Sequence, residues 1–143
     1  VFFIHKYSTL LFRMNLKIIF KRLILLDLLG LILIFVAAIN ESELVAAINE
    51  SINPPNDKIV IIGVIGILYV ALYFLNLYLL YKFKNIGKQM YLFLFIFISI
   101  FPLFFGAYAY DPIYFLLNGL GWASSGAILV FLYFTPIKKE FEK

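Results

Sequence analysis

Four long runs of apolar residues alternate with polar segments along this chain, and this pattern predicts its architecture. The runs cover Leu23–Ile39, Ile59–Tyr81, Met90–Tyr110 and Ile113–Phe134. About 20 apolar residues in an α-helix cross the hydrocarbon core of a bilayer, and a helix satisfies its own backbone hydrogen bonds there. The sequence therefore predicts an all-α integral membrane protein. We expect a four-helix bundle with the antiparallel order up-down-up-down, in a single domain that covers residues 1–143.

Two of the connections between the runs are short, which favours antiparallel hairpins. Lys82–Gln89 is predicted to be a tight polar turn, with Gly87 as the stop of the second helix. Asp111 precedes a proline that suits the start of the fourth helix. In the third run, Pro102 predicts a kink, because proline removes a helical hydrogen bond.

The first connection, residues 40–58, is longer and contains a tandem repeat. The heptapeptide V-A-A-I-N-E-S begins at Val36 and again at Val45, nine residues later. Two copies are fewer than the three or more that a solenoid requires. The simpler interpretation is a duplication in a flexible loop, because loops accept insertions at a small entropic cost. The alternative is a short surface helix over Ser42–Ser51, ended by the two prolines that follow.

Basic residues flank the runs on alternate sides, and this predicts the orientation. Of the twelve lysines and arginines, all but Lys58 lie in the N-terminal segment, the second connection or the C-terminal tail. Because cytoplasmic flanks are enriched in Lys and Arg, we expect both termini and the second connection in the cytoplasm. The predicted location is the inner (plasma) membrane of a bacterium, with residues 40–58 as an external loop.

Two alternatives concern the beginning of the chain. Met14 opens a basic flank of the kind that precedes a first span, so residues 1–13 could be an extension over-read from upstream sequence. Ala37 and Ala38 follow a basic segment and an apolar run, which also suits cleavage of a signal peptide. Against cleavage, Asp27 interrupts the apolar run. Both alternatives stay open at this point.

The composition agrees with lipid as the main solvent and excludes several kinds of chemistry. Hydrophobic residues make up 64% of the chain and charged residues 14%, whereas soluble domains have about 25% charged residues. With no cysteine, the chain has no disulfide, thiolate metal site or cysteine nucleophile. The net charge of +4 comes from short clusters between the runs, which does not indicate nucleic-acid binding. We assign no catalytic residue, metal site or cofactor.

Asp27 is the only acidic or basic residue within the four predicted spans. Such residues are costly in a bilayer and usually face the interior of a bundle. On the second run, Tyr69, Tyr73 and Asn76 share one helix face, and Asn76 lies at about the depth of Asp27. We therefore expect a polar cluster of these four residues, with a hydrogen bond between Asp27 and Asn76, as the candidate binding site.

The fourth run carries a stripe of small residues. Gly119, Ala123 and Ala127 are spaced by four, which lets two helices approach closely. We predict that this stripe packs within the bundle, with a dimer contact as the alternative. Trp122 is expected inside the bundle, and Tyr91 is assigned to the aromatic belt at the cytoplasmic interface.

Two hypotheses about function follow. The first is a non-enzymatic accessory protein, whose partners are the lipid bilayer and another membrane protein or a second copy of this chain. The alternative is a small proton- or cation-linked transporter or channel that uses Asp27. A cavity lined by the polar cluster would favour the transporter, whereas tight packing around the same residues would favour the accessory protein.

Overall fold

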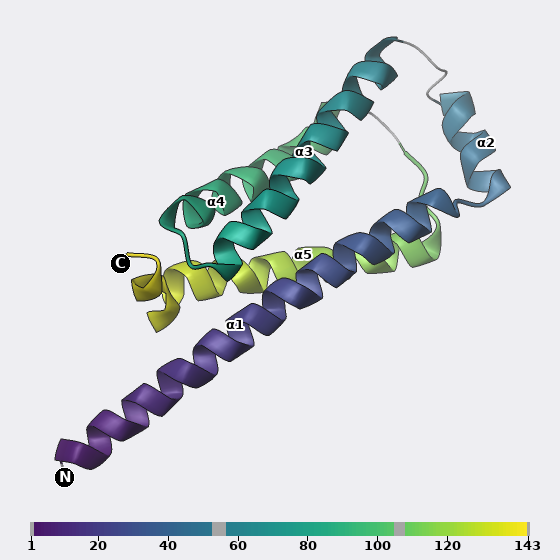
Figure 1. Ribbon diagram of the computed structural model, residues 1–143. Helices are drawn as coiled ribbons and strands as arrows, with labels where there is room; N and C mark the ends of the chain where they lie inside the picture. Colours follow the sequence, from purple (N-terminus) through teal and green to yellow (C-terminus); the bar gives the residue numbers. More distant parts are fainter. Residues whose placement is uncertain (1, 53–56, 105–107, 143) are drawn as a thin grey trace.

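The computed structural model describes residues 2–52, 57–104 and 108–142, and within these ranges every regular element is a helix (Figure 1). The long elements are α1 (Phe2–Ile39), α2 (Glu43–Ile52), α3 (Asp57–Tyr81), α4 (Asn85–Ile100) and α5 (Pro112–Phe134). Two short 3₁₀ helices follow α4 and α5, namely η1 (Phe101–Phe104) and η2 (Pro136–Glu140).

Four of these helices are long and apolar enough to cross a membrane, which indicates a multi-pass membrane protein, as predicted. The candidate spans are Asn15–Ile39, Ile61–Tyr81, Asn85–Phe104 and Pro112–Phe134. The first starts earlier than expected, because α1 is continuous through the basic flank. The third starts before Met90, and residues 105–107 of its predicted range lie outside the described residues.

The turn between α3 and α4 is shorter than predicted, and Gly87 does not end α3. Phe83 has a positive φ of 54°. Its N–H donates to the carbonyl of Leu80 (2.9 Å), and the N–H of Lys84 donates to that of Leu79 (2.9 Å). This pair of bonds is the Schellman closure of a helix, made here without glycine. Gly87 instead lies buried in α4, where a Cβ would come within 2.8 Å of the Cβ of Leu79.

Pro102 ends the regular α-helix instead of kinking it. The helix α4 stops at Ile100 and continues as the 3₁₀ turn η1, which contains the proline. Ser99 donates its hydroxyl to the carbonyl of Phe95 (2.7 Å). Proline lacks an N–H and clashes with the preceding helical turn, so the chain leaves the α-helical conformation at this point.

The helices pack mainly as α1 with α5 and α3 with α4, and the two pairs meet near η2 (Figure 1). Phe20 lies at the centre of this region, with ring centroids 5.8 Å from Phe83, 6.1 Å from Phe131 and 5.9 Å from Phe141. We call this region, which includes the buried Leu80, the closed end. Toward α2, in contrast, α1 and α3 diverge (Figure 1). We call that region, bounded by α2, η1 and the start of α5, the open end.

Basic side chains gather at the closed end. Lys17 forms an ion pair with Glu140 (2.8 Å). The ammonium group of Lys21 lies 4.3 Å from the ring centroid of Tyr81, and that of Lys88 lies 4.8 Å from the ring centroid of Tyr133. These contacts join the start of the first span, the α3–α4 connection and the C-terminal segment. The three basic segments that the sequence assigns to one side of the membrane therefore lie together.

Candidate functional site

Asp27 is buried on α1, 4% exposed, and its carboxylate accepts hydrogen bonds from three hydroxyl groups. Tyr73 of α3 donates to Oδ2, and Ser124 of α5 donates to Oδ1. Ser125 of α5 also donates to Oδ1, at 3.2 Å. A buried carboxylate is costly unless hydrogen bonds or an opposite charge stabilise it. Here neutral donors from two neighbouring helices provide the stabilisation.

The hydrogen bonds extend from Asp27 through Tyr73 to α4. The hydroxyl of Tyr91 in α4 lies 3.3 Å from that of Tyr73. Because Tyr73 gives its only hydroxyl hydrogen to Asp27, Tyr91 is the donor in this pair. Asp27, Tyr73, Tyr91, Ser124 and Ser125, which we call the hydroxyl cluster, thus connect α1, α3, α4 and α5.

Of the three residues predicted to join Asp27, two lie on the face of α3 that is directed toward Asp27, and the third is directed toward α4. Tyr73 contacts Asp27 directly, and Tyr69 stacks on Tyr73 with 5.8 Å between ring centroids. Asn76 is fully buried against α4, where its amide donates to the carbonyl of Gly87 (2.8 Å) and accepts from the N–H of Tyr91 (3.3 Å). The predicted bond between Asp27 and Asn76 is therefore wrong.

Ser124, Ser125 and Tyr91 are members of this site that the sequence pattern does not predict. The two serines were detectable as neighbouring polar residues within an apolar run. Which helix they face depends on how α5 is rotated about its axis, and that rotation is a property of packing. Tyr91 was assigned to an interfacial belt, but it is 1% exposed and reaches the hydroxyl cluster.

The rotation of α5 also differs from the one that the small-residue stripe predicted. Gly119 and Ala123 are exposed, and a Cβ on Gly119 would meet nothing within 4 Å. Ala127 is half-buried. The close approach to α1 occurs instead at Gly121, where a Cβ would lie 3.3 Å from Cδ1 of Ile34. The predicted packing role of the stripe within the bundle is therefore wrong for its first two members.

A hollow of about 300 Å³, partly open to the surface, lies beside the hydroxyl cluster and is lined by residues of α1, α3, α4 and α5. We call it the inner cavity. Asp27, Tyr69, Tyr73, Tyr91 and Ser125 form one part of its wall. The remaining lining residues are mostly apolar or small, and these are Leu31, Ile34, Phe35, Ala38, Gly66, Val70, Phe95, Ile98, Tyr114, Asn118, Gly121 and Trp122.

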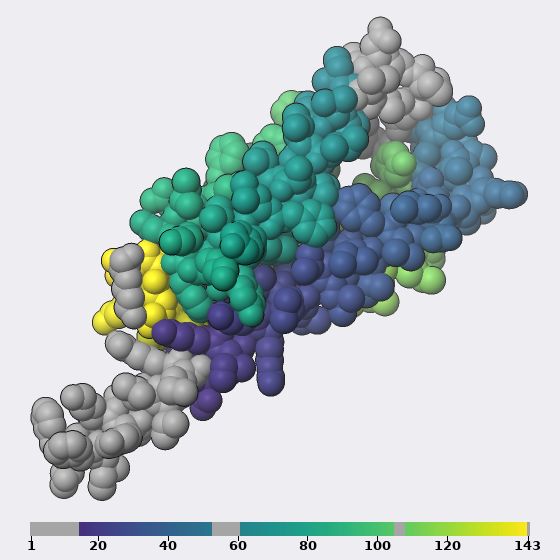
Figure 2. All heavy atoms as spheres, viewed as in Figure 1, coloured from purple at the N-terminus to yellow at the C-terminus, as the bar shows by residue number. Residues whose placement is uncertain are grey.

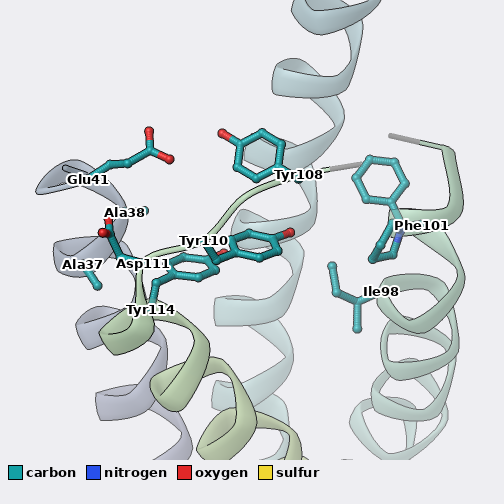
Figure 3. Close-up of a pocket in the computed structure, with 10 residues that line it drawn as sticks. Ala37, Ala38, Glu41, Ile98, Phe101, Tyr108, Tyr110, Asp111 and Tyr114 are labelled. Atoms are coloured by element: carbon teal, nitrogen blue, oxygen red, sulfur yellow. The ribbon is translucent and has the colours of Figure 1, made fainter. Parts of the chain in front are cut away.

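A second hollow of about 610 Å³ lies at the open end, and we call it the vestibule (Figure 3). Figure 3 shows tyrosine rings between α1 on one side and α4 with η1 on the other. Two of these rings, Tyr110 and Tyr114, stack with 5.0 Å between their centroids. Ala38, Ile98 and Tyr114 line both hollows. The inner cavity and the vestibule therefore adjoin, and we call the line from the vestibule through the inner cavity to Asp27 the route.

The vestibule carries acidic groups. Glu41 and Asp111 line it, and neither hollow has a Lys, Arg or His among its described lining residues. Burial raises the pKa of the Tyr108 hydroxyl, and the nearby Glu41 and Tyr110 raise it further. Tyr108 therefore stays a neutral hydrogen-bond donor near neutral pH. The route from the open end to Asp27 thus favours positive charge.

The described part of the first connection, residues 40–52, is docked on the segment that precedes α5, so the flexible-loop interpretation is wrong and the short surface helix is confirmed as α2. The backbone N–H and the hydroxyl of Ser42 donate to the carboxylate of Asp111 (2.9 and 2.8 Å). Asn49 is buried, donates to Glu41 (2.9 Å) and to the carbonyl of Ala109 (3.0 Å), and accepts from the N–H of Ala109 (2.8 Å). Figure 2 shows α2 standing apart from α3, with the segment before α5 visible between them. The two prolines expected to end α2 lie outside the described residues.

Within the described residues, no group of three or more His, Cys, Asp or Glu side chains could hold a metal ion. No protein-family model, curated protein or solved structure matches this chain. The class of protein that the fold supports is a multi-pass helical membrane protein. Its function has to be inferred from the geometry around Asp27.

Proposed function

We propose that this protein is a small membrane transporter in which Asp27 binds a cation, including a proton, that arrives through the vestibule. The observation that carries the proposal is the inner cavity, because Asp27, Tyr69 and Tyr73 all line it. The accessory-protein hypothesis expects tight packing around these residues. The transporter hypothesis expects a cavity beside them.

The charges along the route support a cationic solute. Glu41 and Asp111 lie at the vestibule, and Asp27 lies at the inner cavity. A cleft lined by charges of one sign and walled by apolar groups concentrates ions of the opposite sign. The cluster also offers proton-exchanging hydroxyls next to the carboxylate. This arrangement suits a cation that enters from the open end and stops at Asp27.

The proposal includes an orientation in the membrane. We place the closed end and both termini in the cytoplasm and the vestibule outside, with the spans in the order up-down-up-down. The gathering of Lys17, Lys21 and Lys88 at the closed end supports this, because cytoplasmic flanks are rich in basic residues. The inner membrane of a bacterium is the location that we propose.

A second candidate function is the non-enzymatic accessory protein, whose partners would be the bilayer and another membrane protein or a second copy of this chain. One observation favours it. Three hydroxyl donors already stabilise the Asp27 carboxylate without any ligand. In that case the hydroxyl cluster would fix the arrangement of the helices, as interhelical hydrogen bonds in membranes do with about 0.6 kcal/mol each.

The two candidates are separated by replacing the charge of Asp27 while keeping its size, as in Asp27→Asn. The purified protein is reconstituted into liposomes with a pH-sensitive dye inside, and a membrane potential is applied with valinomycin and a potassium gradient. For a transporter we expect potential-driven proton uptake by the wild type and none by Asp27→Asn. The melting temperatures of the two proteins in detergent should agree within a few degrees. Equal uptake by both proteins, or no uptake by the wild type, would contradict the proposal.

A further inference from the structure

The carboxylate of Asp27 has an acceptor position to spare. A carboxylate offers about four lone-pair sites. Among the described residues, Oδ1 accepts from Ser124 and Ser125, whereas Oδ2 accepts from Tyr73 alone. Asp27 also lines the inner cavity. A ligand in that cavity therefore lies beside Asp27, whose Oδ2 accepts one hydrogen bond fewer than Oδ1.

The rest of the wall does not suit a bare metal ion. A metal ion without its water shell needs several oxygen or nitrogen ligands. Within the described residues, no cluster of acidic, His or Cys side chains supplies them. The hydroxyls nearest to Asp27 already point their hydrogens at its carboxylate. The Asp27 carboxylate is therefore the one charged group that the wall provides. A cation that carries its own N–H donor can bind to this single group, because it needs no further ligands.

The apolar wall defines the other half of the ligand. The rings of Phe95 and Trp122 meet edge to face, with 5.4 Å between centroids, and both line the inner cavity. Tyr69 and Tyr73 contribute stacked rings near the carboxylate. Aromatic rings bind apolar groups and attract cations over their faces. The volume of about 300 Å³ is at the lower limit of small-molecule sites and favours a ligand with a single ring.

Building on the proposed function, we infer that the inner cavity binds a protonated amine that carries a small flat apolar group. The ammonium N–H donates to Asp27, and the apolar group lies against the wall that contains Phe95 and Trp122. A quaternary ammonium ion has the charge but no N–H, and an alcohol has the donor but no charge. Neither should replace the amine.

Trp122 provides the measurement, because it is the only tryptophan in the chain and it lines the cavity. It is 37% exposed, so the prediction that it packs inside the bundle is wrong. The three probes each carry a 2-phenylethyl group and differ only in the polar group: 2-phenylethylamine, trimethyl(2-phenylethyl)ammonium and 2-phenylethanol. Each is titrated into the purified full-length protein in detergent while Trp122 fluorescence is recorded. We expect a saturable change with the amine, and at least about tenfold weaker binding of the other two, the value of one charge-assisted hydrogen bond. This comparison uses the wild type alone and does not depend on the folding of a variant.

Two variants locate the site. Asp27→Asn should weaken amine binding at least about tenfold, whereas Glu43→Gln, which removes an exposed acid on α2, should leave it unchanged. Equal affinity for the three probes, or no saturable change with the amine, would overturn the inference. If amine binding is absent but Asp27-dependent proton uptake is present, the amine site is wrong and the transporter stands. If amine binding is present but the liposomes take up neither protons nor the amine, the amine site stands and the transport function is wrong.

Discussion

The closed and open ends of this bundle are built from the same four long helices, yet one end is packed and the other is hollow. At the closed end, large rings fill the space between the helices, with Phe20 at the centre of three others. At the open end, small residues such as Ala38, Gly66 and Gly121 face the space between the helices, and the two hollows lie there. Aromatic side chains are present at both ends, but at the open end they line the hollows together with small residues instead of filling the space between the helices.

The hydroxyl cluster lies where the closed end and the open end meet, so it borders both the packed region and the hollow one. Tyr73 and Tyr91 belong to the buried core and also line the inner cavity. The rings of the closed end lie on one side of Asp27, and the route to the vestibule lies on the other. The account therefore predicts access to Asp27 from the open end only. The following experiments test each part of this comparison.

The largest effect is expected for labelling from the two sides of the membrane. The chain has no cysteine, so Glu43→Cys at the open end and Lys84→Cys at the closed end each introduce a single thiol. In intact cells, a membrane-impermeant maleimide should label the thiol at position 43 and leave the one at 84 unlabelled until the cells are opened. The reverse pattern would invert the proposed orientation.

A smaller effect should follow from adding one methyl group at either end. Gly87→Ala places a Cβ 2.8 Å from the Cβ of Leu79. Overpacking of this kind costs about 1–3 kcal/mol, so the melting temperature in detergent should fall. Gly119→Ala is the matched control, because nothing lies within 4 Å of its Cβ. It should be neutral or stabilise the helix by up to about 1 kcal/mol. Equal shifts for the two variants would show that α3 and α4 do not approach as closely as described.

The smallest and most local effect, confined to α2, is expected from a comparison of the two copies of the repeat. Asn49 in the second copy is buried and bonds to the backbone of Ala109, whereas its counterpart Asn40, which follows the end of α1, is exposed and donates to the carbonyl of Val36 (2.7 Å). Asn49→Ala should destabilise the docking of α2 by about 1 kcal/mol, since it leaves the partly buried N–H and carbonyl of Ala109 without their partner. Faster hydrogen exchange in α2 measures this loss. Asn40→Ala should change the exchange little, and similar exchange in both variants would mean that α2 is not held by Asn49.

The parts of this structure that could be predicted from the sequence are those set by local composition. The four apolar helices follow from hydropathy, and Tyr73 beside Asp27 follows from depth and helix periodicity. The end of α3 could not be read, because Phe83 takes the left-handed position that glycine usually occupies. The hydrogen-bond partners of Asn76 and of the serines of α5 could not be predicted either, because they depend on how packing rotates each helix about its axis. The docking of α2 rests on contacts with residues far along the chain, which the repeat does not reveal.

The central claim is that the inner cavity is reached from the open end while the closed end stays packed. Val70→Cys places a thiol in the wall of the inner cavity, and Leu77→Cys places one seven residues later in α3, in the buried core. The test treats each variant with 2-aminoethyl methanethiosulfonate, a small cationic thiol reagent, and with the anionic sulfonatoethyl analogue. We predict rapid modification at position 70 by the cationic reagent, slower modification there by the anionic one, and no modification at position 77. Equal reactivity at the two positions, or an inert thiol at position 70, would contradict the account.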